Sequence, residues 1–182
     1  MKHTPFIRVV PGADTAVLMI HGIVGSPDHF KDLLPLIPED WSIYNILLDG
    51  HGGEVEDFSH TSMKKWKSQV HAQLDEILLT HRKVLVIAHS MGTLFAIAEA
   101  ISRPDSIDAL FLLNVPLMPF VQPKTAVNSV RMALGKSKNH WEARALEAAG
   151  SVNLSPKLWK YVGWTPRFWE LLQVSDPVWV LC

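Results

Sequence analysis

Short apolar runs alternate with longer amphipathic stretches along the chain, and this alternation is the strongest pattern in its sequence. The runs are rich in Val, Ile and Leu and show no regular alternation of apolar and polar positions. Runs of this kind are typical of strands that are buried on both faces of a sheet. They predict five strands, at residues 17–20, 43–48, 84–88, 109–113 and 178–181.

Apolar residues at spacings of three and four predict helices between these strands. Ser62 is placed to cap a helix over residues 63–77, and a second apolar stripe covers residues 91–101. A shorter candidate at residues 28–34 is stopped by Pro35. Because strands and helices alternate, the pattern predicts an α/β fold with a mostly parallel sheet and helices on both faces.

Residues 116–175 break the alternation, because they contain no strand-like run of comparable quality. They hold four of the seven tryptophans and two expected helices, near residues 126–134 and 139–149. We interpret this segment as a helical cap inserted into a core that begins with residues 1–115. Residues 176–182 would then start the next core strand, and the fold would be truncated after it.

Composition narrows the class of protein further. Hydrophobic residues make up 48% and charged residues 19% of the chain, as in globular proteins with a core. The net charge is -1 and the basic residues form no stripe, so we expect neither nucleic acid nor an anionic membrane as a partner. The lone cysteine, Cys182, fits a reducing compartment. With no signal-peptide core and no segment able to span a bilayer, a cytoplasmic protein is expected.

The segment Ala88-His89-Ser90-Met91-Gly92 carries the clearest chemistry, because it joins an expected buried strand to an expected helix. A serine on such a tight turn is lifted clear of the sheet, and the turn requires small residues two positions before and after it. The helix that begins behind the serine offers free N–H groups to a developing oxyanion. In this segment the chain resembles the α/β-hydrolase superfamily, although that family usually has glycine where Ala88 stands. The resemblance implies that Ser90 is a catalytic nucleophile.

A second motif of the same family lies after the first expected strand, at His21-Gly22-Ile23. In the family, the chain bends here so that a backbone N–H faces the nucleophile. The resemblance implies an oxyanion hole formed by the backbone N–H groups of Ile23 and Met91. His21, Gly22 and Gly92 would then support the loops that carry them.

Two other histidines stand near these motifs and are expected to be structural. The sequence Gly50-His51-Gly52 resembles a glycine-rich loop of the family, and we interpret His51 as part of a turn and not as a catalytic group. The side chain of His89 should point away from Ser90, because neighbouring side chains on a strand alternate.

The rest of a catalytic triad is not evident. In this fold the order is serine, then a carboxylate, then histidine, and the carboxylate commonly follows the strand after the cap. Both partners are therefore expected beyond residue 182. His140 is interpreted as a cap-surface residue, and Asn114 occupies an alternative acid position that needs a carboxylate. The chain as given is accordingly expected to be nearly inactive.

The resemblance is greatest to small bacterial carboxylesterases and monoacylglycerol-lipase-like enzymes. It implies hydrolysis of a short- or medium-chain carboxylic ester through an acyl-enzyme on Ser90, with no cofactor and no metal. A C–C-bond or small-peptide hydrolase is one alternative. A catalytically incomplete fragment or a non-enzymatic hydrolase-like binding protein is another. Self-association through the edge of the strand at residues 178–181 is also expected.

Overall fold

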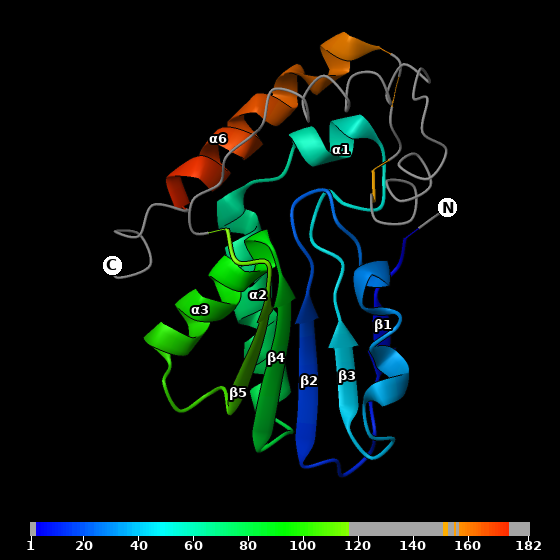
Figure 1. The fold of residues 1–182 in the computed structure, drawn as a ribbon, viewed down its shortest axis with the longest axis vertical. Helices are drawn as coiled ribbons and strands as arrows, with labels where there is room; N and C mark the ends of the chain where they lie inside the picture. Colours follow the sequence, from blue (N-terminus) through cyan, green and yellow to red (C-terminus); the bar gives the residue numbers. More distant parts are fainter. Residues whose placement is uncertain (1–2, 117–150, 153–154, 156, 175–182) are drawn as a thin grey trace.

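The computed structural model of the chain describes residues 3–116, 151–152, 155 and 157–174. These residues form a five-stranded sheet with the strand order β1-β3-β2-β4-β5 (Figure 1). Strands β2, β3, β4 and β5 pair in parallel, and β1 pairs antiparallel with β3. The expected mostly parallel α/β sheet is therefore present. The strands are β1 (Phe6–Arg8), β2 (Thr15–Ile20), β3 (Ser42–Asn45), β4 (Lys83–His89) and β5 (Ala109–Leu113).

The strand positions follow the apolar runs, with two differences. Strand β3 ends at Asn45, whereas the apolar run continues to residue 48. Ile46 and Leu48 remain buried in the core after the strand has ended, so their hydrophobicity reports burial and not strand pairing. Strand β1 was not expected, because its three residues are too short a run to give a periodic signal. The expected strand at residues 178–181 lies outside the described residues.

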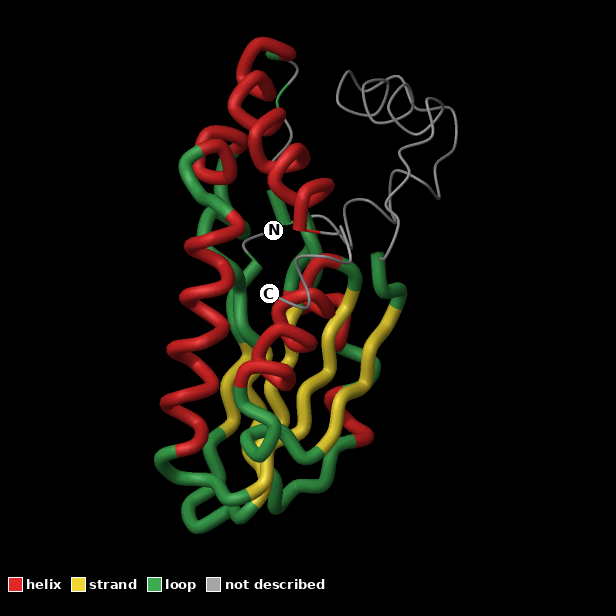
Figure 2. The backbone as a smooth tube through the Cα atoms, turned by 90° about the vertical axis from the view of Figure 1, so that its left-hand side faces the viewer, coloured by secondary structure: helices red, strands yellow, loops and turns green. Residues whose placement is uncertain are grey.

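One face of the sheet is covered by two long helices, α2 (Met63–Leu78) and α3 (Met91–Ser102) (Figure 2). Ser62 caps α2 as expected, because its side chain accepts a hydrogen bond from the Lys65 N–H. The apolar stripe of α2 packs in one core with the inward side chains of β2 and β4. Trp66 is the largest of these residues and is fully buried.

No helix among the described residues is long and apolar enough to cross a membrane.

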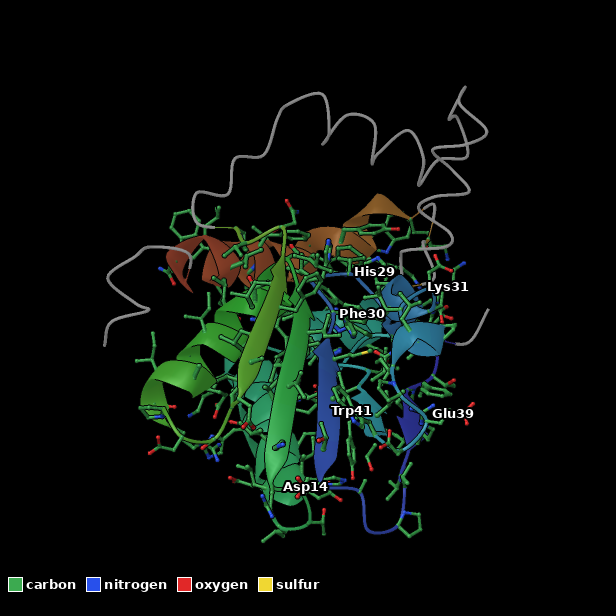
Figure 3. All side chains as sticks on the ribbon, turned by 60° about the horizontal axis from the view of Figure 1, so that its bottom comes forward. Asp14, His29, Phe30, Lys31, Glu39 and Trp41 are labelled. Atoms are coloured by element: carbon green, nitrogen blue, oxygen red, sulfur yellow. The ribbon has the colours of Figure 1, made fainter. Side chains whose placement is uncertain are left out.

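The opposite face is covered by two short 3-10 helices, η1 (Pro27–Phe30) and η2 (Leu34–Leu36). The single helix expected at residues 28–34 is therefore wrong in form. Pro35 lies inside η2, where it lacks the backbone N–H that would continue an α-helix from η1. Phe30 packs on this face beside Val17 and Met19, and Trp41 adds to the same cluster (Figure 3).

Strand β5 departs from the expected burial on both faces. Its first three residues are exposed, and the Phe111 side chain is 57% exposed. The reason is its position, because β5 is the last strand of the described sheet and no described helix covers its outer face.

Three short elements lie above the carboxyl ends of the parallel strands: α1 (Val55–Ser59), η3 (Leu158–Trp164) and α6 (Thr165–Val174) (Figure 1). The Trp164 indole donates a hydrogen bond of 2.9 Å to the Val55 carbonyl, and its ring lies 4.7 Å from that of Phe58. The Met63 N–H also donates to the Glu170 carboxylate, at 2.9 Å. The described part of the 116–175 segment is thus helical and docks on α1 and α2. The helices expected at residues 126–134 and 139–149 lie outside the described residues.

Candidate active site

Ser90 stands at the sharp turn between β4 and α3. Its backbone has φ 52° and ψ -125°, a conformation that residues other than glycine rarely adopt. Hydrogen bonds hold this turn on both sides, because the Ser90 N–H donates to the Leu113 carbonyl at 2.9 Å and the Thr93 hydroxyl donates to the Ser90 carbonyl at 2.6 Å. Strained backbone that its surroundings hold in place is characteristic of functional sites.

The small residues on either side of this turn are required by close packing. A Cβ at Gly92 would lie 2.7 Å from the carbonyl oxygen of His21, and closer still to that of Ile20. The first turn of α3 therefore presses against the carboxyl end of β2, and Ala88 is fully buried beneath it. This is the physical reason for the spacing of small residues around Ser90.

The loop after β2 lies directly against the serine. A Cβ at Gly22 would be 2.8 Å from Ser90 Cβ and 3.3 Å from Ser90 Oγ. Ile23 follows Gly22 in this loop, and Met91 is the first residue of α3, where a backbone N–H has no partner within the helix. The structure thus brings together Ser90 and the residues expected to support it, namely His21, Gly22, Ile23, Met91 and Gly92.

His21 and His51 tie this loop to the loop after β3. The His21 ring is fully buried, with Nδ1 at 2.8 Å from the Gly22 carbonyl oxygen and Nε2 accepting from the Leu48 N–H at 3.0 Å. His51 is arranged in the same way, with Nδ1 next to the Leu48 and Asp49 carbonyls and Nε2 accepting from the Val24 N–H at 3.1 Å.

Burial keeps both imidazoles neutral. It lowers the pKa of His51 to about 4, and burial, with His51 as a neighbour, lowers the pKa of His21 well below its usual value. Because both ring nitrogens of each residue are engaged with the backbone, neither is free to take a proton from Ser90. The expectation that His51 is structural agrees with this geometry.

His89 packs edge-on against His29 of η1, with ring centroids 5.1 Å apart. Burial lowers the pKa of both rings, and within the described part of the chain the Nδ1 atom of each is buried without a hydrogen-bond partner. His89 therefore contacts the η1 side of the sheet, as the alternation of side chains along a strand requires.

The described residues contain no histidine or carboxylate that hydrogen-bonds to Ser90 Oγ. Asn114 directly follows β5 and has φ 55°, and His140 lies outside the described residues. No group of three or more His, Cys, Asp or Glu residues in the described ranges could hold a metal ion.

The cavity beside the loop after β3 does not contain the serine. Its polar lining groups already bond to each other or to backbone, since Lys65 pairs with Asp49 at 3.4 Å and Gln69 bonds to the Asp49 N–H and the Leu47 carbonyl.

One residue of the site gave no signal in the sequence. Val24 has φ 55°, and a β-branched residue is the least expected kind at a positive φ. Glycine would have marked such a turn, but Gly25 stands one position later. The three-dimensional contacts of Val24 are what reveal it.

Comparisons with known proteins identify a family for this chain. The family model described as "Alpha/beta hydrolase family" matches residues 17–181. A comparison with curated protein sequences found no match.

Solved structures share the fold at low sequence identity. One comes from work on LipS and LipT, two metagenome-derived lipolytic enzymes, with 16% identity, 96% of this chain covered and a TM-score of 0.68. A marine microorganism esterase has 19% identity, 80% coverage of this chain and a TM-score of 0.54. The monoacylglycerol lipase of Paleococcus ferrophilus has 20% identity, 96% coverage and a TM-score of 0.58. The chain spans 68%, 58% and 72% of these three proteins, respectively.

Proposed function

Because the chain belongs to the alpha/beta hydrolase family, we propose that it is a serine hydrolase whose nucleophile is Ser90. The observation that carries this proposal is the strained turn at Ser90 with Gly22 packed directly on its side chain. A serine with no chemical role gains nothing from a positive φ, and an ordinary strand-to-helix turn does not need a glycine in contact with it.

In the proposed reaction, Ser90 Oγ attacks the carbonyl carbon of an ester and forms a tetrahedral intermediate. The backbone N–H groups of Ile23 and Met91 stabilise its oxyanion, and each such donor contributes about 2.7–4 kcal/mol in a comparable hydrolase. When the intermediate collapses, the ester C–O bond breaks and the departing oxygen takes the proton that Ser90 lost. The alcohol leaves, and an acyl group stays on Ser90. Water then attacks this acyl-enzyme and releases the acid.

A base must take the proton of Ser90, and a neutral histidine is the usual one in this order of residues. His21 and His51 are excluded by their backbone hydrogen bonds. His140 is the histidine that follows Ser90 in the sequence, so substitution of His140 is the direct test of whether the base lies within this chain.

We propose a short- or medium-chain carboxylic ester as the substrate. Lipolytic and esterase structures among the similar folds support an acyl ester. The described cap segment adds exposed aromatic groups, since Trp159 and Trp169 are 69% and 62% exposed. Aromatic side chains of this kind can contact an acyl chain.

The test is hydrolysis of p-nitrophenyl acetate, butyrate, octanoate and palmitate by the purified chain. We expect only slow turnover, because no described histidine or carboxylate bonds to Ser90 Oγ. That slow rate should exceed the buffer rate, be greatest for butyrate or octanoate, and be lost in Ser90→Ala. The matched control is Ser68→Ala, because Ser68 is exposed on α2 and should leave the rate unchanged. Equal turnover by Ser90→Ala and the unaltered chain would reject the proposed nucleophile.

A further inference from the structure

Val24 occupies a backbone conformation that its side chain opposes. Residues 22–25 form a turn, closed by a hydrogen bond of 3.0 Å from the Gly25 N–H to the Gly22 carbonyl. Val24 is the third residue of this turn and has φ 55°, at a position that glycine usually fills. Such strain persists only where the surrounding structure holds the residue in place.

Two contacts hold Val24, one at each end of its backbone unit. The Val24 N–H donates to His51 Nε2 at 3.1 Å, and the Val24 carbonyl accepts from the Ser151 N–H at 3.0 Å. The Ser151 carbonyl in turn accepts from the Gly52 N–H at 2.7 Å. Val24 is thus tied to the loop after β3 and to a residue of the 116–175 segment.

This turn fixes the direction of the Ile23 N–H. The Gly22 carbonyl and the Ile23 N–H belong to one planar peptide group and point in opposite directions. That carbonyl accepts from the Gly25 N–H and lies 2.8 Å from His21 Nδ1, so its direction is set by both. The positive φ of Val24 is part of the turn in which the Gly25 N–H reaches this carbonyl.

We propose that His51, together with the backbone N–H of Ser151, is a positioning residue that holds Val24 in the left-handed conformation and thereby aims the Ile23 N–H at Ser90. The inference rests on the proposed function, because it assigns Ile23 to the oxyanion hole. It gives His51 a role that its place in a glycine-rich turn does not reveal.

The role requires a neutral His51, since Nε2 must accept a hydrogen bond. The groups that face its ring are His21 at 4.8 Å between centroids, Phe58 at 5.1 Å, Trp66 at 5.4 Å, and Asp49, which is paired with Lys65. Burial among them keeps the pKa of His51 at about 4, so Nε2 stays unprotonated at neutral pH.

Two substitutions separate the acceptor of His51 from its donor. In His51→Gln the side-chain oxygen stands where Nε2 stands and accepts from Val24. In His51→Asn the shorter amide retains only the donor position of Nδ1. Amide hydrogen exchange of Val24 reports the hydrogen bond, and the labelling rate of Ser90 by a fluorophosphonate probe reports the oxyanion hole.

We expect His51→Gln to keep the Val24 amide protected from exchange. The rate at which its Ser90 is labelled should be within about threefold of the rate in the unaltered chain. His51→Asn should lose that protection and label about tenfold to a hundredfold more slowly, because a small misplacement of a reacting group costs up to about that factor. The double variant His51→Asn, Val24→Gly should recover most of the rate, because glycine adopts a positive φ without strain. A role limited to stability predicts no such recovery.

Each failure has a separate meaning. If Ser90 of the unaltered chain is not labelled, the proposed function fails and this inference falls with it. If Ser90 is labelled but His51→Asn labels at the same rate after losing Val24 protection, only the positioning role is overturned. If His51→Asn does not fold, amide hydrogen exchange of Val24 is measured at acid pH in its place. Protection of the Val24 amide should fall near pH 4 in the unaltered chain and persist in His51→Gln. Equal loss of protection in both proteins overturns the proposal.

Discussion

Three residues other than glycine have a positive φ in the described part of the chain: Val24, Ser90 and Asn114. Each lies beyond the carboxyl end of a parallel strand, and these ends meet at one edge of the sheet. In open α/β sheets this edge is where ligands bind. The unusual conformations of the chain thus gather where the family places its chemistry.

Gly22 gives the sharpest prediction at the residue scale. The Cβ of Gly22→Ala would lie 2.8 Å from Ser90 Cβ and 3.2 Å from the His89 carbonyl oxygen, so the loop must move away from the serine. We expect fluorophosphonate labelling of Ser90 to fall at least about tenfold, through displacement of an oxyanion-hole donor. The labelled fraction against time, measured by mass spectrometry, checks this.

Gly12→Ala is the matched control for this substitution. A Cβ at Gly12 meets nothing within 4 Å, but φ is 76°, so the variant costs about 1–2 kcal/mol of backbone strain far from the site. Its melting temperature should fall while labelling of Ser90 stays unchanged. Unimpaired labelling in Gly22→Ala would mean that the loop does not contribute to reactivity.

A pH prediction follows from His51. Its pKa is lowered from 6.5 to about 4 in the folded chain, so between these values the unfolded state binds a proton that the folded state does not. The contribution of His51 to the free energy of unfolding is therefore fully present above pH 6.5, and it is lost as the pH drops toward 4. Between these two pH values, the slope of unfolding free energy against pH, from urea titrations, should be smaller in His51→Gln. The difference in slope should correspond to the binding of about one proton. An unchanged slope would show that His51 already carries its proton when folded.

At the scale of elements, the packing of α2 against α3 depends on a buried carboxylate. Glu99 of α3 is 2% exposed, accepts from Arg103 at 2.8 Å and lies 3.1 Å from His71 of α2. Arg103 also pairs with Asp75 of α2, so the two helices share one network of charges.

Removal of Arg103 should leave the Glu99 charge buried with less compensation. We expect Arg103→Met to lower the free energy of unfolding by about 3 kcal/mol. Arg82→Met is the control, because the Arg82 side chain is 83% exposed and its pair with Asp14 should contribute less than about 1 kcal/mol. Equal effects of the two substitutions on the free energy of unfolding in urea would contradict this role of the charges between α2 and α3.

The sequence predicted the elements that have long periodic patterns and missed those that depend on distant contacts. Helices α2 and α3 and strands β2 and β4 follow from apolar spacing alone. Helix α1 was missed because its five residues are too few for a periodic signal, and its burial comes from Trp164, more than a hundred residues later. The Ser90 turn was predictable because close packing restricts its neighbours to small residues.

At the scale of the whole molecule, we propose that the 116–175 segment acts as a cap over the site. Its described helices cover the carboxyl ends of the strands, and Trp164 anchors them to α1 (Figure 1). A long-chain alkyl phosphonate bound at Ser90 should then change tryptophan fluorescence. Trp159→Phe with Trp169→Phe should reduce that change, and no change in the unaltered chain would count against a cap that contacts the acyl group.

The exposed apolar side chains of β5 carry a prediction about association. Leu110 and Phe111 are 36% and 57% exposed on the last strand of the described sheet, and exposed apolar strands recruit other chains. We expect the mass from sedimentation equilibrium to rise with concentration, and to rise less in Phe111→Lys. The expected contact through residues 178–181 lies outside the described residues. A monomer at all concentrations would reject association.

The most direct test of the account is where a fluorophosphonate probe reacts. The account predicts one dominant adduct, on Ser90, because the strained turn sets this serine against the Gly22 loop and the Ile23 and Met91 N–H groups are proposed to stabilise the attacked centre. Mass spectrometry of the intact labelled chain and of its peptides should find that adduct, and Ser90→Ala should lose it while Ser68→Ala keeps it. An adduct on another serine, or equal labelling of Ser90→Ala, would contradict the account.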